Sequence, residues 1–329
     1  MDRTGELLTY QGMQEDISRT LDTHLPSELD AAIQWLDQLG IAYSQTRFGR
    51  YKLTLDRLES ARVTAESARI KVESALVKEV NLYDIARRLN AFAPLFEANE
   101  LAMIHAGLSG RGLGTYLRPR LEELVAGPES YVDESAARPK ARNTGFELAV
   151  IARLATAGLI IQQDENLADV VARLGNTIYV VECKRPQSEA GVYDAIRGAR
   201  KQLDTRYLQM DTANATGFIA LDLTKVFNPT LSVTDDMSAH EMVPQINTRM
   251  RSLLRRHIKD WERVKDDRTA GILLRHSELA WIESNKRMSL FHKYAITHVP
   301  GRSPARRVTV TAVEEALNRA LLSEGTLIT

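Results

Sequence analysis

Two acidic residues and a lysine stand at the ends of two adjacent apolar segments of this chain. Glu182 and Lys184 close the run Ile178-Tyr179-Val180-Val181, and Asp169 opens the preceding apolar segment, residues 169–174. Carboxylates bind hard divalent cations such as Mg²⁺. A lysine beside them can orient a water molecule or stabilise developing negative charge. These residue types together predict a metal-dependent site for phosphodiester hydrolysis.

The spacing of these residues predicts how a β-hairpin would bring them together. Only Gly175-Asn176 separates residues 169–174 from residues 177–184, and both segments are rich in apolar and β-branched residues. A two-residue loop of this kind is typical of a tight hairpin. With that loop, Asp169 lies opposite Glu182, and Lys184 shares a face with Glu182 because side chains alternate along a strand. A shift of one residue would send the two acids to opposite faces.

Acidic residues at a strand end can also be plain solvated side chains. The run of residues 178–181, apolar on both faces, is typical of an interior strand. Two carboxylates facing each other there would repel unless a cation or a proton joined them. Burial therefore favours the metal-site interpretation.

A third acid, Glu147, lies on a helix predicted over residues 143–158. It belongs to the apolar stripe of that helix, which is the side that packs inward. However, Thr144-x-x-Glu147 also fits a capping box, in which the glutamate would bond the start of the helix. The sequence leaves both roles open, helix cap or third acid of the site.

The expected order of elements around these residues is helix, strand, strand, strand, helix, strand. A short strand over residues 159–161 precedes the hairpin, a helix over 189–209 follows it, and a strand over 216–223 comes next. With this order, Asp169, the triplet Glu182-Cys183-Lys184 and the upstream Glu147, the segment 143–225 resembles the PD-(D/E)XK nuclease superfamily. The resemblance implies an α/β fold with a restriction-endonuclease-like αβββαβ core and a mixed central sheet.

The resemblance also implies roles for individual residues. Asp169, Glu182 and Glu147 would bind Mg²⁺ or Mn²⁺, Lys184 would assist the attacking water, and all four would be catalytic. Ala168 stands where the family name places a proline, which is a weakly constrained position. The family's exonuclease-like branches have a glutamine and a tyrosine four positions apart, whereas here Gln202 and Tyr207 are five apart. Gln202 is therefore either a residue near the site or a plain surface glutamine.

Cys183 is the only cysteine of the chain, which excludes an intramolecular disulfide and a cysteine zinc cluster. Between Glu182 and Lys184, its side chain points to the opposite face, where a small buried apolar group is expected. The role of Lys184 stays open between base and cation. A bound metal would lower its proton affinity, and the two carboxylates would raise it.

A net charge of zero argues against an indiscriminate nucleic-acid binder. Basic residues nevertheless cluster on the helix after the triplet and on a helix predicted over residues 239–265. Such clusters can neutralise phosphates, although basic helical faces are commonly just solvated. Next to a phosphodiesterase site they favour a nucleic-acid partner, DNA ahead of RNA. The candidate nucleic-acid contacts are Arg185, Arg197, Arg200, Lys201, Arg251 and Arg255.

Two regions are expected from the rest of the chain. Residues 1–137 would be α-helical, with long amphipathic helices over residues 43–99 that serve oligomerisation or a partner protein. Residues 138–329 would be the nuclease domain. They include a β-rich extension over 270–297, with strands near 271–274, 279–282 and 290–296, and a closing helix capped by Thr311. Whether the extension joins the nuclease sheet or forms a separate unit is open.

Composition is that of an ordinary soluble protein, with 44% hydrophobic and 26% charged residues in 329. The sequence has no apolar run that would span a membrane, and its N-terminus lacks the layout of a signal peptide, so a cytoplasmic location is expected. We therefore expect a Mg²⁺-dependent nuclease, with a bacterial defence or restriction effector as a fold-level analogy. The alternatives are an RNA-cleaving enzyme of the same fold and a catalytically inactive nucleic-acid-binding or interaction scaffold.

Overall fold

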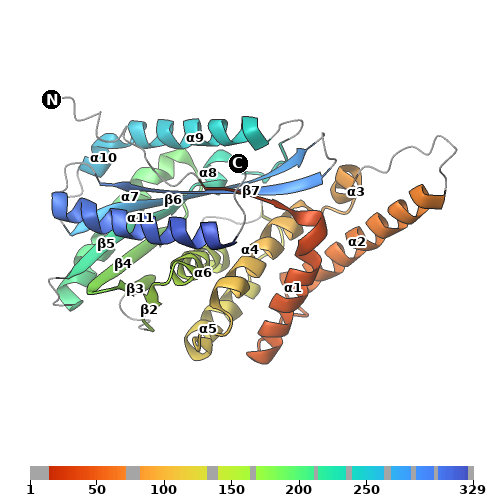
Figure 1. Cartoon of the computed structure of the whole chain (residues 1–329), viewed down its shortest axis with the longest axis horizontal. Helices are drawn as coiled ribbons and strands as arrows, with labels where there is room; N and C mark the ends of the chain where they lie inside the picture. The colour runs from red at the N-terminus through yellow and green to blue at the C-terminus, as the bar shows by residue number, and fades with distance from the viewer. Residues whose placement is uncertain are drawn as a thin grey trace.

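A computed structural model describes residues 15–71, 82–131, 140–163, 168–210, 214–234, 239–262, 268–282, 287–299 and 303–324. Its centre is a seven-stranded sheet with the order β1-β7-β6-β5-β4-β3-β2 (Figure 1). Helices surround this sheet, so the expected α/β class is confirmed. No helix of the described ranges is long and apolar enough to cross a membrane.

Runs of helices and runs of strands follow one another along the chain. The strands are β1 (Glu15–Thr20), β2 (Ile160–Ile161), β3 (Val170–Leu174), β4 (Thr177–Lys184), β5 (Ala215–Asp222), β6 (Thr269–Ile282) and β7 (Arg287–His298). The helices are α1 (Leu21–Gln38), α2 (Arg47–Lys71), α3 (Leu82–Arg88), α4 (Phe92–Leu108), α5 (Gly114–Val125), α6 (Lys140–Thr156), η2 (Glu189–Gly191), α7 (Val192–Met210), α8 (Thr224–Phe227), α9 (Ala239–Arg256), α10 (Ile258–Glu262) and α11 (Pro304–Glu324). The predicted order is present as α6-β2-β3-β4-α7-β5.

The sheet is mixed in strand direction. β2, β3 and β4 form an antiparallel meander, β5 runs parallel to β4, and β6 runs parallel to β5. β7 and β1 add two antiparallel strands at the other end. α7 is therefore the crossover that joins the parallel strands β4 and β5, and it runs back against their direction.

The hairpin of β3 and β4 has the predicted register. Leu174 lies opposite Thr177, and Val170 lies opposite Val181. Gly175 has a φ of 58°, as a glycine has at the first position of a type II′ turn. The turn was therefore placed correctly from the sequence, and it sets which residues of the hairpin face each other.

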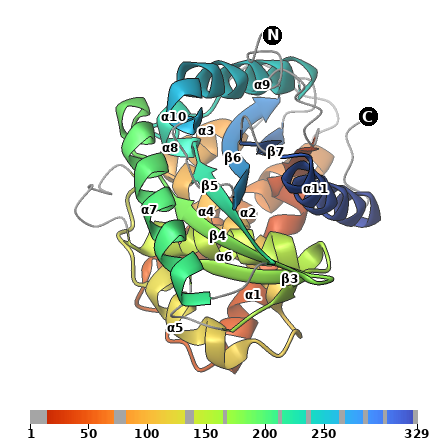
Figure 2. The same ribbon diagram turned by 90° about the vertical axis from the view of Figure 1, so that its left-hand side faces the viewer.

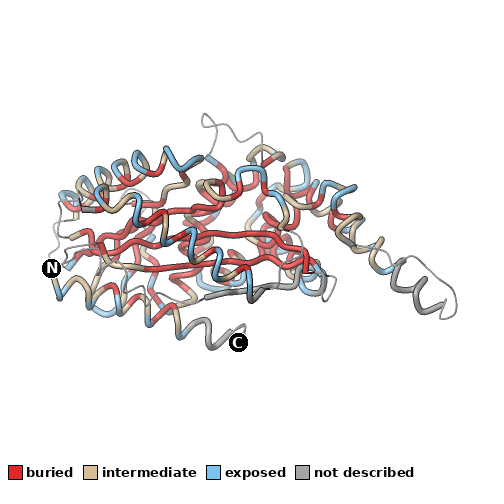
Figure 3. Tube along the Cα trace, turned by 90° about the horizontal axis from the view of Figure 1, so that it is seen from above, coloured by how far each residue is buried: buried red, intermediate tan, exposed pale blue. Residues whose placement is uncertain are grey.

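Helices cover both faces of the sheet (Figures 1 and 2). α7, α9 and α10 pack on one face, with Leu203, Met250 and Trp261 in the buried cluster beneath them. α1, α4, α6 and α11 belong to the cluster on the other face. Figure 3 shows the result, with the strands almost entirely buried between two partly exposed helical layers.

The helices before residue 131 share a core with the rest of the chain. β1 pairs with β7, and α4 and α5 pack against α6. One buried cluster contains Leu29 of α1, Leu101 of α4, Ile151 of α6 and Leu317 of α11. The predicted boundary between residues 137 and 138 lies outside the described residues, but the parts on either side of it are packed together.

Several predicted element boundaries are wrong. The β-rich extension joins the central sheet, and its first two expected strands are a single strand, β6. The helical stretch over residues 43–99 contains α2, α3 and the start of α4. α6 begins at Lys140 and α11 at Pro304, so Thr144 and Thr311 lie inside helices and do not cap them. Capping motifs were misleading here because the same residues also fit a helix interior.

Candidate functional site

Glu182 and Asp169 meet at the end of the β3–β4 hairpin. Val181 and Cys183 belong to the buried cluster on the α6 side of the sheet, so Glu182 between them points to the α7 side. Its side chain is fully buried. Asp169 directly precedes β3, and its Oδ2 accepts a hydrogen bond of 2.8 Å from the backbone N–H of Cys183. This bond fixes the Asp169 carboxylate beside β4.

Lys184 lies between the two acids. Its Nζ is 3.4 Å from Asp169 Oδ2 and 3.5 Å from Glu182 Oε2, and it donates a hydrogen bond of 2.9 Å to the carbonyl oxygen of Cys183. The side chain is 24% exposed, so the ammonium group remains accessible from solvent. The structure thus brings Asp169, Glu182 and Lys184 together, as the hairpin geometry predicted.

The surroundings of Glu182 and Glu147 disfavour the ionised form of both carboxyl groups. Burial raises the pKa of Glu182 to about 7, and the charge of Asp169 adds to that effect while Lys184 and Arg206 oppose it. Burial also raises the pKa of Glu147 to about 8, with the charge of Asp169 adding and Arg120 and Lys184 opposing. A divalent cation at such a site would favour the ionised carboxylates.

Arg206 is a member of the site that the sequence analysis missed. Its Nε lies 3.4 Å from Glu182 Oε1, and its side chain is 25% exposed. It stands on α7 one helical turn after Gln202, on a helix whose apolar side faces the sheet. This position on α7 could have indicated Arg206 from the sequence, because a basic residue next to the apolar stripe of a crossover helix can reach the strand beneath it.

Gln202 lies on the same side of α7 as Arg206. It is half-buried, and its Oε1 has no hydrogen-bond partner within the described part of the chain. Because α7 runs against β4, Gln202 lies one turn closer than Arg206 to the end of β4 that carries Lys184. Gln202 therefore lies on the Glu182 side of the sheet, and its part in the site stays a prediction.

Glu147 stands beside the acid pair. Its helix begins four residues before Thr144, and the Thr144 hydroxyl donates to Glu123 at 3.0 Å, so the capping-box explanation is wrong. The Glu147 side chain is 21% exposed and lies 3.7 Å from Arg120. In the described ranges, however, no group of three or more His, Cys, Asp or Glu side chains is placed to hold one metal ion. The geometry therefore supports a two-carboxylate site rather than the predicted three-acid one.

The donor set of Asp169 and Glu182 fits Mg²⁺ or Mn²⁺. Proteins hold Mg²⁺ through one or two carboxylates, and the ion keeps several of its waters. Burial and the charge of Asp169 keep the pKa of Glu182 raised despite Lys184 and Arg206, and a cation bound to both carboxylates would favour their ionised forms. The residues that would hold the ion are Asp169 and Glu182.

Cys183 takes the position expected of a structural residue. It is 7% exposed within the buried cluster on the α6 side. Burial raises the pKa of its thiol well above the ordinary value, and the neighbouring acids add to that effect. A thiol in this environment stays protonated and is a poor nucleophile.

The prediction of Arg185 as a nucleic-acid contact is not supported. Its side chain is 4% exposed, and its Nε lies 3.1 Å from Oδ2 of the buried Asp222. Arg275 pairs with the same oxygen at 2.8 Å. The two guanidinium groups hold the pKa of Asp222 well below its usual range against the effect of burial. The buried carboxylate thus holds Arg185 inside the molecule.

The other basic candidates lie on the outer surfaces of α7 and α9, the helices on the Glu182 side of the sheet. Arg197 is 71% exposed and pairs with Asp194, and Arg200 is 26% exposed and lies 3.7 Å from Asp204. Lys201, Arg251 and Arg255 are exposed. Arg197, Lys201, Arg251 and Arg255 are therefore placed where a large anion could reach them, whereas Arg200 is partly buried.

Comparison with known proteins gives this chain no relative: no family model, no curated protein and no solved structure matches it. The family resemblance therefore rests on the acid and lysine residues and on the order of the elements.

Proposed function

We propose that this protein is a metal-dependent nuclease with a restriction-endonuclease-like core. One observation carries the proposal: a fully buried Glu182 faces Asp169 at a hairpin end, with the Lys184 ammonium group within 3.5 Å of both carboxylates. The element order α6-β2-β3-β4-α7-β5 supports the core type. Buried acids with raised pKa values beside a charged partner are frequent at functional sites.

The chemistry proposed for this site is hydrolysis of a phosphodiester. Asp169 and Glu182 would hold Mg²⁺ or Mn²⁺, which when bound supplies an activated water and neutralises charge on the phosphoryl oxygens. Lys184 is placed to orient that water or to stabilise negative charge that develops in the transition state. Arg206, which already contacts Glu182, supplies a second cation beside the buried acid.

DNA is the proposed substrate, ahead of RNA. The exposed basic surface of α7 and α9, on the same side of the sheet as Glu182, supports a nucleic-acid substrate of either kind. Such a surface recognises the phosphate backbone and gives no preference among base sequences. RNA is the alternative within the same reaction class, because the acid pair would act on a phosphodiester whatever the sugar.

The test is cleavage of labelled duplex DNA, single-stranded DNA and RNA by the purified full-length protein with Mg²⁺, with Mn²⁺ or with a chelator. Asp169→Asn, Glu182→Gln and Lys184→Met should each lower the metal-dependent rate by at least about a hundredfold. The matched control is Glu315→Gln, which changes an exposed residue of α11 and should cleave like the wild type.

Metal-dependent cleavage at the wild-type rate by any one of the three site variants would contradict the proposal. Nucleic-acid binding by a wild-type protein that cleaves none of the substrates would favour the inactive scaffold instead.

A further inference from the structure

Arg120 of α5 reaches the acid site from the helical layer. Its Nη1 donates a hydrogen bond of 2.8 Å to the backbone carbonyl of Asp169 and lies 3.7 Å from Glu147 Oε2. Its guanidinium group stacks over the ring of Tyr116 at 4.8 Å. The side chain is 14% exposed. One arginine thus contacts two residues of the predicted site and is itself held in place by an aromatic ring.

Strand geometry explains why the carbonyl of Asp169 is open to this contact. Val170, the first residue of β3, is the residue farthest from the turn that pairs with β4. Beyond it, the N–H of Cys183 donates to the Asp169 side chain. Along an antiparallel strand, successive carbonyls point to alternate edges. The carbonyl of Val171 points towards the β2 edge, where it accepts from Gln162 N–H. The carbonyl of Asp169 points to the same edge, and there Arg120 donates to it.

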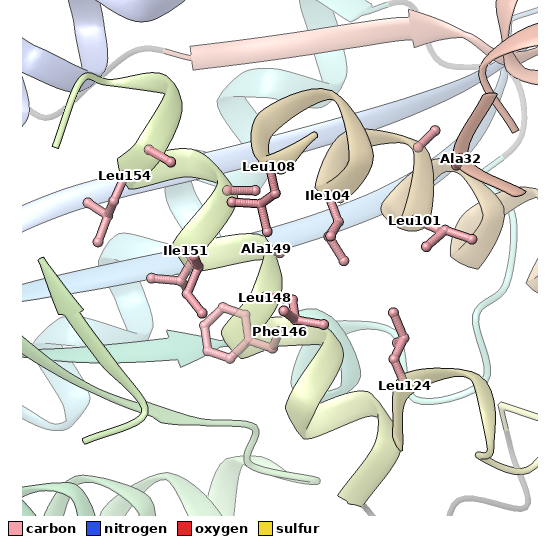
Figure 4. Close-up of a cluster of buried hydrophobic side chains, with 14 of the residues drawn as sticks. Ala32, Leu101, Ile104, Leu108, Leu124, Phe146, Leu148, Ala149, Ile151 and Leu154 are labelled. Atoms are coloured by element: carbon pink, nitrogen blue, oxygen red, sulfur yellow. The ribbon is translucent and has the colours of Figure 1, made fainter. Parts of the chain in front are cut away.

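The helix that carries Arg120 is fixed by the hydrophobic core. Leu117, Leu121 and Leu124 of α5 are buried. Figure 4 shows Leu124 facing the side of α6 that carries Leu148. Because both helices pack into one cluster, the distance from the Arg120 backbone to Asp169 and Glu147 is set by packing and not by a flexible surface.

A second arginine on the same helix shows the contrast. Arg118 is 54% exposed and pairs with Glu122 one turn along α5, an arrangement that contributes little to stability. Arg120 instead bonds residues far away in the chain and is largely shielded from water. An arginine with only a surface role would be exposed and would pair within its own helix, as Arg118 does.

We propose that Arg120 is a positioning residue, which holds the Asp169 backbone and the Glu147 carboxylate in place for metal binding at the Asp169–Glu182 pair. The inference rests on the proposed function and adds that the helical layer is part of the site. Partners of this kind, which touch a metal's ligands but not the metal, typically change metal affinity about 10- to 100-fold when removed.

The test measures metal binding directly, without substrate. Mn²⁺ is titrated into full-length wild type, Arg120→Met, Arg120→Lys and the control Arg118→Met, and free Mn²⁺ is followed by electron paramagnetic resonance. Arg120→Met should weaken binding by about 10- to 100-fold, and Arg118→Met should stay within about twofold of the wild type. Arg120→Lys should fall between them, because an ammonium group keeps the charge but not the planar guanidinium that stacks on Tyr116.

Folding of the variants is checked by circular dichroism and by the unfolding midpoint. Arg120 also lines an open hollow of about 410 Å³ between α5 and α6, so its truncation leaves space continuous with solvent and no closed cavity. If Arg120→Met fails to fold, Arg120→Lys decides, and wild-type Mn²⁺ affinity in that variant would overturn the inference. Equal losses in Arg120→Met and Arg118→Met would overturn it as well.

The outcomes separate this inference from the proposed function. A wild type that binds Mn²⁺ through Asp169, loses affinity in Arg120→Met, and yet cleaves no nucleic acid would contradict the nuclease and leave the positioning role standing. A wild type that cleaves while Arg120→Met binds and cleaves equally well would contradict the positioning role alone. Absence of Mn²⁺ binding by the wild type would overturn both.

Discussion

Glu182 and Glu147 are held where an ionised carboxylate is costly. Glu182 is fully buried beside Asp169, and Glu147 lies near the same aspartate with Arg120 as its partner. The cations Lys184, Arg206 and Arg120 offset this cost only in part, since the pKa of each glutamate stays raised despite them. Buried carboxylates of this kind would stabilise a bound cation, and they lower the stability of the metal-free protein.

The metal-free protein should therefore lose stability as the pH rises. The pKa values of Glu182 and Glu147 rise from 4.5 to about 7 and about 8 on folding. Between these limits the folded state binds more protons than the unfolded chain. The stabilising contribution is complete below about pH 4.5 and is lost as the pH rises through about 7 for Glu182 and about 8 for Glu147. Urea unfolding in the presence of a chelator measures it.

Single substitutions test whether Glu147 and Glu182 cause this pH dependence of the free energy of unfolding. At about pH 8, Glu147→Gln and Glu182→Gln should each be more stable than the wild type by about 1–3 kcal/mol. The amide does not ionise, so these variants avoid the cost of burying a negative charge. The exposed control Glu315→Gln should keep the wild-type slope. A wild-type free energy of unfolding that increased from about pH 5 to about pH 8 would contradict the assignment.

At the scale of elements, the β3–β4 hairpin decides whether the acids meet. Its two-residue turn sets a pairing that runs out to Val170 and Val181, and Asp169 and Glu182 are the next residues on the two sides. Gly175 makes the turn possible through its positive φ. No atom outside the turn lies within 4 Å of where a Cβ at Gly175 would be, so the requirement for glycine comes from the backbone alone.

Gly175→Ala should destabilise the protein by about 1–2 kcal/mol, the cost of a left-handed conformation for a residue with a side chain. Asn176→Ala, the neighbouring position without a positive φ, is the matched control and should change stability by less than half as much. Thermal unfolding of the two variants tests this. A Gly175→Ala variant as stable as the wild type would show that the turn does not require glycine.

At the scale of the whole molecule, the early helices and the sheet form one packed unit. Figure 4 shows α6 meeting α4 through Leu101, Ile104 and Leu108. The contact is also ionic: Arg275 of β6 bonds Glu100 of α4 at 2.5 Å and the buried Asp222 at 2.8 Å. Of the helices expected to serve a partner protein, α4 packs against α6, α3 against β7, and α2 against α4 and α1, and the partner interface stays a prediction.

Residues 138–329, the predicted nuclease domain, should therefore not fold when expressed alone. Removing the earlier helices would expose Leu148 and Ala152 and leave Arg275 without Glu100. The expected result is a fragment without cooperative thermal unfolding and with rapid proteolysis, because large exposed apolar patches and unpaired buried charges are each destabilising. A fragment that unfolds cooperatively and keeps cleavage activity would contradict the shared core.

The sequence by itself determined the local part of the site. The alternation of apolar residues and the two-residue turn are short-range signals, and they specified β3, β4, their register and the meeting of Asp169 with Glu182 and Lys184. The order of helices and strands from α6 to β5 followed from periodicity in the same way. These features depend on neighbours along the chain, so composition and spacing carry them.

Only the tertiary structure decided which distant side chains complete that site. Arg120 lies 49 positions from Asp169 in the chain, and Arg185 turned inward because Asp222, on the next strand of the sheet, is buried beside it. Burial and partner choice for a charged side chain depend on the layers that pack around it, and residue spacing does not encode those layers. The hairpin fixed the acid pair locally, and the packing of α5, α6 and α7 around it decided its electrostatics.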